Sequence, residues 1–273
     1  MGVGGPKVIS SAVDAGSMSR VFGETTRQVL RGLRAVISFL TVLPVGWTED
    51  TVETAARNME LFPLAGAVVG AVAGLSSLVF LTFLPPTVAG LLTLGVLLLL
   101  TGLHHTDGLL DFGDGLMLAG SREEKIQAMH DTATGAGGFG LGLVVLLTTA
   151  FAISALRASS APLVLVSAET KAKTAMVMAA GLGRSANPGL GRQFIEGMHG
   201  KNRVVKMALP AAFALAVGLV ASGAVGVLSV LGGFAASAVL IQVSDRHFGG
   251  LTGDVFGAMN DIARMAALLV IVA

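Results

Sequence analysis

The 273-residue sequence contains no cysteine and no tyrosine, and only 13% of its residues are charged. Without cysteine the chain has no disulfide, no thiol nucleophile and no cysteine-ligated zinc. A soluble domain typically carries about 25% charged residues, so this chain has roughly half of the usual solvating surface. Its formal net charge of +1 gives no reason to expect a nucleic-acid partner. The missing charge favours a membrane protein.

Long apolar segments fill most of the chain, which is 53% hydrophobic and has a mean hydropathy of +0.79. A spanning helix needs roughly 20 mainly apolar residues. The clearest candidates are 61–84, 87–103, 139–156, 207–222 and 224–243, and weaker ones are 35–45, 163–182 and 262–273. We therefore predict an all-α, polytopic integral membrane bundle of about six to eight helical segments, most of them spans, in the lipid bilayer of the cell membrane.

The N-terminal part differs from this apolar pattern. Residues 1–19 lack the apolar stretch of a signal peptide. Arginines at 20, 27, 31 and 34 then precede the first apolar segment, which by the positive-inside rule places the N-terminus in the cytoplasm. We predict a cytoplasmic N-terminal segment over 1–34 and one polytopic membrane catalytic domain over 35–273, which could form a homo-oligomer.

Glycines recur every four residues at Gly66, Gly70 and Gly74. This spacing places them on one face of a helix, and such stripes let helix backbones approach closely in lipid. We predict a helix-packing surface here rather than a ligand site.

Three aspartates, Asp107, Asp111 and Asp114, are spaced i, i+4 and i+7 and share one helical face, with His104 beside it. Three carboxylates in one stripe repel each other, and a hard divalent cation such as Mg²⁺, Ca²⁺ or Mn²⁺ would offset that repulsion. A helix cap at Asp107, a solvated polar face and a cation relay in a transporter remain alternatives. Gly108 and its counterpart at 115 leave open backbone where a phosphate could approach.

A short helix that begins near Ser121 ends at Asp131, just before the glycine-rich residues 135–140. Since this helix lies between two apolar segments, it can bring Asp131 back towards the aspartate stripe. Lys171 and Lys173 interrupt an apolar segment and are candidates for binding anionic phosphates.

A glycine-rich stretch near the C-terminus offers a further polar cluster. Repeated glycines let backbone amides point at an anion, although the stretch could also be only a tight turn. It has neither the Walker A lysine nor the spacing of a dinucleotide-binding loop. The candidate binding residues of this cluster are Arg246, Gly249, Gly250, Thr252, Gly253 and Asp254.

Five motifs occur in one order along the chain. They are Phe39-Leu-Thr-Val-Leu-Pro44, Phe62-Pro-Leu-Ala-Gly66, Gly102-Leu-His-His-Thr-Asp107-Gly-Leu-Leu-Asp111-Phe-Gly-Asp114-Gly115, Arg122-Glu123 followed by Met129-His-Asp131, and Gly249-Gly-Leu-Thr-Gly-Asp254. Together they resemble the cobalamin synthase family, the adenosylcobinamide-GDP ribazoletransferases. The doubled His104-His105 makes the alignment of histidine to aspartate with the family pattern ambiguous by one residue but leaves the aspartate spacing intact.

The resemblance implies a magnesium-dependent reaction in which α-ribazole, or its 5′-phosphate, attacks the cobinamide-linked phosphate of adenosylcobinamide-GDP. GMP leaves, and cobalamin or its 5′-phosphate forms at a site that faces the cytoplasm. We expect Asp107, Asp111, Asp114 and Asp131 to bind one or two Mg²⁺. Either His104 or His105 could deprotonate the attacking hydroxyl, and an aspartate could serve equally. Lys171, Lys173 and the glycine-rich cluster are assigned to the phosphates.

Two other readings compete with this one. CDP-alcohol phosphatidyltransferases also place spaced aspartates on membrane helices, but their Asp-Gly-x-x-Ala-Arg pattern meets Asp111 and Phe112 here. An ion-coupled transporter could use the aspartate stripe as its cation site, yet it should show inverted hydropathy repeats, which this sequence lacks. The enzyme reading is favoured.

Overall fold

The computed structural model describes residues 15–273, and every element of regular secondary structure in that range is a helix. The helices are α1 (Ala15–Leu40), α2 (Thr51–Arg57), the 3-10 turn η1 (Met59–Leu61), α3 (Phe62–Phe83), α4 (Pro86–Leu100), α5 (His104–Met117), α6 (Arg122–Met129), α7 (Ala136–Ser154), α8 (Ala161–Leu182), α9 (Leu190–Met198), α10 (Arg203–His247) and α11 (Gly253–Val272). The all-α prediction is confirmed. The helices outnumber the predicted segments because the short α2, α6 and α9 lie between the apolar ones.

Four helical stretches of the described range are long and apolar enough to cross a membrane: Met59–Phe83, α7, α10 and α11. Helices α4 and α5 meet at 97° and would together form a fifth, broken span. The prediction of a polytopic membrane protein is therefore confirmed. Helix α8 lies among these helices and carries three charged residues, Glu169, Lys171 and Lys173.

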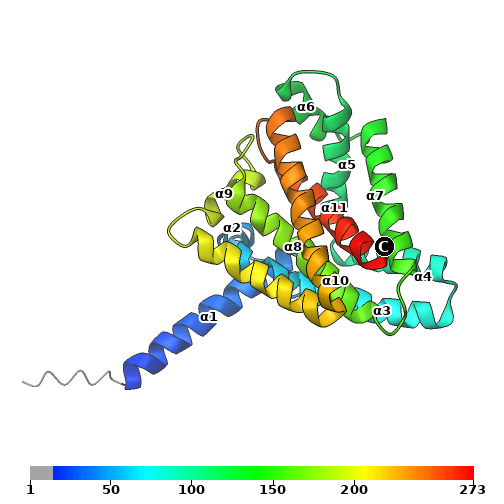
Figure 1. Ribbon diagram of the computed structural model, residues 1–273. Helices are drawn as coiled ribbons and strands as arrows, with labels where there is room; N and C mark the ends of the chain where they lie inside the picture. Colours follow the sequence, from blue (N-terminus) through cyan, green and yellow to red (C-terminus); the bar gives the residue numbers. More distant parts are fainter. Residues whose placement is uncertain (1–14) are drawn as a thin grey trace, which may run out of the picture.

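The predicted short span at 35–45 is wrong. Helix α1 continues through residue 34, projects away from the rest of the chain and ends at Leu40 (Figure 1). An irregular stretch follows over 41–50, because Pro44 lacks the amide that a helix needs and Gly46 has a φ of +98°. The predicted boundary at 34/35 thus falls inside one continuous helix.

Helix α10 is two helices joined by a bend. Ser222 (φ −150°, ψ 20°) and Gly223 (φ 59°, ψ −137°) have non-helical backbones, and the halves on either side run in different directions (Figure 1, yellow and orange). This break separates the predicted apolar segments 207–222 and 224–243, which are therefore confirmed as two elements. The apolar residues 262–273 are the second half of α11, whose first turn is capped by the Thr252 hydroxyl, 3.3 Å from the Val255 amide.

The glycine stripe of α3 lies against α8. A Cβ atom on Gly66 would be 2.5 Å from the carbonyl oxygen of Glu169, and one on Gly70 would be 2.5 Å from that of Leu165. As residue numbers increase along α3, the numbers of the contacted residues decrease along α8, so the two helices are antiparallel. The predicted helix-packing role of the stripe is confirmed.

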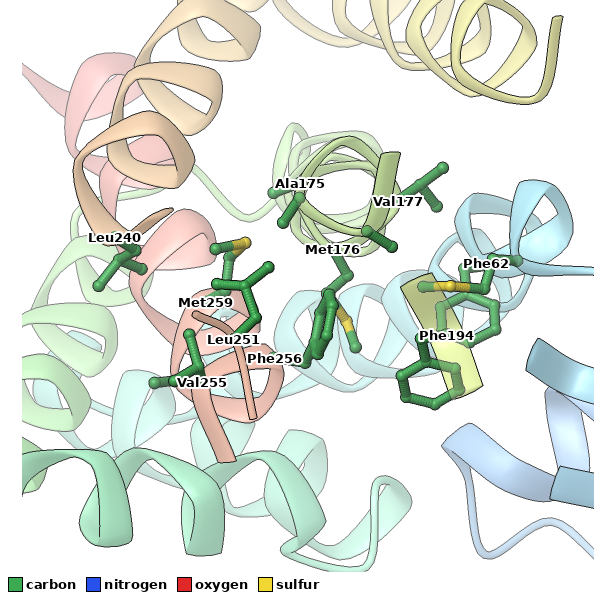
Figure 2. Close-up of a cluster of buried hydrophobic side chains, with 14 of the residues drawn as sticks. Phe62, Ala175, Met176, Val177, Phe194, Leu240, Leu251, Val255, Phe256 and Met259 are labelled. Atoms are coloured by element: carbon green, nitrogen blue, oxygen red, sulfur yellow. The ribbon is translucent and has the colours of Figure 1, made fainter. Parts of the chain in front are cut away.

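A hydrophobic core joins α8 and α11 to α9 and the start of α3. Figure 2 shows Met176 of α8 pointing towards Phe256 of α11, and Phe194 of α9 beside Phe62 of α3. Phe194 makes edge-on ring contacts with Phe62 and Phe256, with ring centroids 5.8 Å and 5.6 Å apart. Edge-to-face pairs at such distances are favourable, and these three rings fix α9 against the core.

We predict that Gly70→Ala lowers the free energy of unfolding by about 1–3 kcal/mol, because overpacking of a close contact costs that much. The apparent unfolding temperature of the detergent-purified protein measures it. Gly95→Ala on α4 is the matched control, since a Cβ there meets no atom within 4 Å. Equal unfolding temperatures for the two variants would contradict the close contact.

Candidate functional site

Helix α5 begins at a sharp turn, and this turn sets the direction of the helix that carries the three aspartates. Gly102 (φ 59°) and Leu103 (φ 64°) are left-handed and redirect the chain by 97° between α4 and α5. The predicted stripe does lie on one helix: Asp107 is exposed, and Asp111 and Asp114 are half-buried on α5.

Glycine contacts bring α11 onto α5. A Cβ on Gly108 would lie 2.8 Å from the carbonyl oxygen of Asp254, and one on Gly257 would lie 2.9 Å from that of His105. Gly108 is therefore covered by α11 rather than open to a phosphate. Its counterpart Gly115 is covered in the same way, by the backbone of α6 at Lys125. The close approach at Gly108 places Asp254 beside the stripe.

Three other carboxylates lie near Asp111 at this contact. The Asp111 side chain is within electrostatic reach of Asp107 and Asp114 on its own helix and of Asp254 on α11. Within the described part of the chain, the charges that act appreciably on Asp111 are all negative. The repulsion at Asp111 is therefore larger than the sequence of α5 indicates. Among the described residues, His130 acts on Asp254 with the opposite sign and compensates the cluster in part.

Two of the predicted ligands have other hydrogen-bond partners. Asp114 accepts hydrogen bonds from the Gly135 and Gly138 amides, at 2.7 and 2.8 Å, and so caps the N-terminus of α7. A carboxylate has further lone pairs, which leaves Asp114 able to bind a cation as well. Asp131 is exposed and accepts a 3.0 Å bond from the Ala133 amide in its own loop, without a described contact to the stripe.

The glycine-rich cluster forms the turn that precedes α11. Gly249 and Gly250 have φ values of 81° and 156°, and the Leu251 amide donates a 2.8 Å hydrogen bond to the Arg184 carbonyl. Thr252 is buried and caps α11, so its hydroxyl has a structural role. Arg246 is exposed at the end of α10. This turn fixes Gly253 and Asp254 at the start of α11, next to α5.

Lys171 and Lys173 lie in the interior. Lys173 is 0% exposed and forms a 3.0 Å ion pair with Glu169, whose other oxygen bonds Arg264 of α11. Lys171 donates a hydrogen bond to Ser229 of α10. A phosphate could reach these lysines only if the core opened, so the structure gives no support to their assignment as phosphate ligands. Glu169 is four residues before Lys173 on α8, a spacing visible in the sequence, whereas its pairing with Arg264 joins different helices and has no local signal.

The ion-pair network continues to α5. Arg264 also bonds Asp261, at 3.0 Å, and Asp261 accepts a 3.0 Å hydrogen bond from the hydroxyl of Thr106. Thr106 precedes Asp107, so buried charges on α8 and α11 hold the first turn of the stripe. The i, i+3 spacing of Asp261 and Arg264 and the i, i+4 spacing of Glu169 and Lys173 are the local signals of this network in the sequence.

The two histidines have different surroundings. His104 is exposed, whereas His105 is 5% exposed. Both line a cavity of about 190 Å³ between α5, α8, α9 and α11. His104 is therefore the histidine with freer access to solvent and to a proton-transfer partner.

The donor set at the stripe fits a hard divalent cation, since Mg²⁺ and Ca²⁺ prefer carboxylate oxygens and the charges that act on Asp111 are all negative among the described residues. Among the described residues, however, no three His, Asp or Glu side chains are grouped closely enough to hold a metal ion. Binding an ion would therefore require the aspartate side chains to rotate towards a common point.

Comparisons with known proteins identify the family of this chain. The family model of cobalamin-5-phosphate synthase matches residues 32–272. The chain belongs to the cobalamin-5-phosphate synthase family. A Methanocella arvoryzae protein named adenosylcobinamide-GDP ribazoletransferase is 36% identical, over 88% of this chain and 94% of its own. Relatives of the same name from Methanococcoides burtonii and Halorubrum lacusprofundi are 32% and 36% identical, over 89% and 88% of this chain and 92% and 96% of theirs.

No solved structure matches the chain. The family match confirms the resemblance and, with it, the transferase class of the family. Its start at residue 32 leaves most of the predicted N-terminal segment outside the matched region.

We predict that Glu169→Gln destabilises the fold by about 3–5 kcal/mol, because it leaves Lys173 and Arg264 as buried charges without their carboxylate. Thermal unfolding in detergent measures the change. Glu196→Gln removes an exposed i, i+4 pair with Arg192 and should cost less than about 1 kcal/mol. A Glu169→Gln protein as stable as this control would contradict the network.

Proposed function

We propose that this protein is an adenosylcobinamide-GDP ribazoletransferase with its active site at the facing ends of α5 and α11. The observation that carries the proposal is the electrostatic proximity of Asp107, Asp114 and Asp254 to Asp111, with carboxylates drawn from two helices and only negative charges acting on Asp111 among the described residues. Phosphoryl transfer requires that charge on the phosphate oxygens be cancelled and that the reacting groups be aligned. An acidic cluster with this excess of negative charge is suited to recruit the cations that do so.

In the proposed reaction, a free ribose hydroxyl of α-ribazole, or of its 5′-phosphate, attacks the cobinamide-linked phosphorus of adenosylcobinamide-GDP. A new phosphoester bond forms, the bond to the bridging oxygen of the diphosphate breaks, and GMP leaves with that oxygen. The hydroxyl proton passes to a base of the protein. His104 suits this role because it is exposed one turn before Asp107, and an aspartate of the cluster is the alternative.

The chain's own residues would hold Mg²⁺ through Asp107, Asp111 and Asp254, with Asp114 in addition to its role as the cap of α7. Bound there, Mg²⁺ would neutralise the diphosphate and stabilise the leaving oxygen. Asp131 remains a proposed ligand on the strength of its place in the loop before α7. The turn at Gly249 and Gly250 would lie beside the diphosphate.

A cytoplasmic orientation is supported by the distribution of basic residues. Four basic residues lie at the end of the helical bundle that holds the site: Arg122, Lys125, Arg184 and Arg246. There Arg184 pairs with Asp245, and Lys125 contacts His247 at 3.0 Å. Helix α7 starts at the site, and Arg157 follows its far end. Because basic residues concentrate on the cytoplasmic side, we place the site in that compartment.

We predict that Asp111→Asn lowers the rate of GMP release at least about 100-fold, as loss of a group that stabilises transition-state charge does. GMP is measured after mixing the detergent-purified protein with adenosylcobinamide-GDP, α-ribazole 5′-phosphate and Mg²⁺. Glu123→Gln, an exposed change on α6, should retain the wild-type rate. Wild-type activity in Asp111→Asn would remove the aspartate cluster from the reaction.

We also predict that EDTA abolishes GMP release and that excess Mg²⁺ restores it, because the carboxylates bind the ion reversibly. Undiminished release in EDTA would contradict the metal assignment while leaving the transfer reaction in place. No release with any divalent cation, from protein that is folded and supplied with lipid, would instead favour the CDP-alcohol or cation-transport readings.

A further inference from the structure

The cavity lined by His104 and His105 has the dimensions of a single ring system. Its volume is about 190 Å³, below the roughly 300–1,000 Å³ of sites that hold whole drug-sized ligands. It lies between the start of α5, the end of α1, and helices α8, α9 and α11. A ligand fragment of one or two fused rings would fill it.

The walls of this cavity are aromatic and apolar. Phe39, Trp47, Phe194 and Phe256 line it together with Met176. The rings are held in place, since Phe39 and Phe256 contact Phe194 edge-on with ring centroids 5.4 Å and 5.6 Å apart. Figure 2 shows the side of this arrangement where Met176 points at Phe256. A flat aromatic ligand would meet ring faces and edges that are already positioned.

One polar side chain in the wall lacks a partner. His105 is 5% exposed, and within the described chain its Nδ1 atom is buried without a hydrogen bond. A buried polar atom left unpaired costs free energy, and an imidazole can donate from one nitrogen and accept at the other. Because Nδ1 itself is enclosed, a turn of the imidazole ring would be needed to present it to the cavity, where a ligand with one hydrogen-bonding ring nitrogen would satisfy it.

The cavity adjoins the acidic cluster. His104 lies three residues before Asp107, about 4.5 Å along the helix axis. On the other wall, Gly253 and Gly257 line the cavity and flank Asp254. A base held in the cavity would therefore place its attached sugar at the aspartates.

We propose that this cavity binds the fused-ring base of the ribazole substrate and that the imidazole of His105 donates a hydrogen bond to the free ring nitrogen of that base. The assignment rests on the proposed function. The benzimidazole of ribazole is flat and apolar, and one of its two ring nitrogens is bonded to the sugar, which leaves a single acceptor. These properties match an apolar cavity with one unpartnered donor.

The guanine of the other substrate fits the cavity less well. Guanine presents several donors and acceptors along two edges, and each would need a partner once buried. The polar side chains of the lining are only His104, His105 and the indole of Trp47. The cavity is therefore assigned to the nucleophile's base, so that the leaving GMP binds elsewhere.

The sole tryptophan of the sequence lies in the cavity wall, so Trp47 fluorescence reports occupancy without any turnover. Titration of the full-length protein in detergent with α-ribazole should change this fluorescence saturably, whereas GMP at the same concentrations should not. No change at millimolar α-ribazole would overturn the proposal. A change caused by GMP that competes with α-ribazole would overturn it as well.

A filled cavity provides the kinetic test. Leu190 lines the cavity and is half-buried, so Leu190→Phe should raise the KM for α-ribazole at least about tenfold and leave the KM for adenosylcobinamide-GDP unchanged. The control, Leu182→Phe, makes the same change at a leucine that is 59% exposed and outside the cavity. An unchanged KM for α-ribazole in a folded Leu190→Phe protein would overturn the proposal.

The hydrogen bond of His105 is tested by pairing a variant with a substrate analogue. Replacing the free ring nitrogen of α-ribazole by CH should lower kcat/KM about fivefold in the wild type, as loss of one hydrogen bond does. His105→Ala should make no such distinction between the two substrates. Equal discrimination by both proteins would remove His105 from base recognition.

These measurements distinguish a failure of the cavity assignment from a failure of the proposed transfer reaction. Fluorescence that responds to α-ribazole in a protein without GMP release would leave the cavity assigned and the transfer reaction rejected. GMP release with an unaltered KM in Leu190→Phe would reject the cavity and leave the reaction standing.

Discussion

The buried pairing of Glu169 with Arg264 and Lys173 is the interaction on which the architecture depends. All three side chains are at most 1% exposed, and charges withdrawn from water are tolerated only when each meets an opposite charge in good geometry. That requirement fixes α8 against α11 in rotation and in register. Through Asp261 and Thr106 it reaches α5, and so it sets the position of the catalytic candidates without itself touching the acidic cluster.

Close glycine contacts set the distances between helices at which the buried ion pairs can form. Gly66 and Gly70 let α3 touch α8, and Gly108 and Gly257 let α5 touch α11. In lipid, helix association gains little from the hydrophobic effect and relies on close backbone packing. Close packing at glycines therefore has two consequences. It closes the interior around the buried charges, and it brings Asp254 against the aspartates of α5.

The site that results has two neighbouring parts of opposite character. The acidic part at α5 and α11 is exposed enough to exchange ions and phosphates, since Asp107 is exposed and Asp111 is half-buried. The adjoining cavity is apolar and aromatic, with His104 and His105 at the boundary. A nucleotide-like nucleophile requires both, one for its base and one for the phosphate it attacks. The region matched by the family model, residues 32–272, contains all of the residues that line these two parts.

Several features of this protein were determined by local sequence. Apolar length predicted α3, α7 and both halves of α10, because a helix that satisfies its own backbone is the segment that can lie in lipid. Spacing placed Asp107, Asp111 and Asp114 on one helical face, and the glycine repeat predicted the α3 contact. These are properties of a helix considered alone, so periodicity suffices to find them.

Only the tertiary structure decided which charges are buried and which meet across helices. Lys171 and Lys173 resemble phosphate ligands in the sequence, but their partners Ser229 and Glu169 enclose them. Asp254 belongs to the stripe because α11 folds back onto α5, and the aromatic cavity is assembled from five helices and a loop. Contacts between residues distant in the chain depend on how helices cross, and no local pattern encodes that. Local sequence therefore predicted most of the apolar helices and the family, whereas packing decided the role of each buried charge.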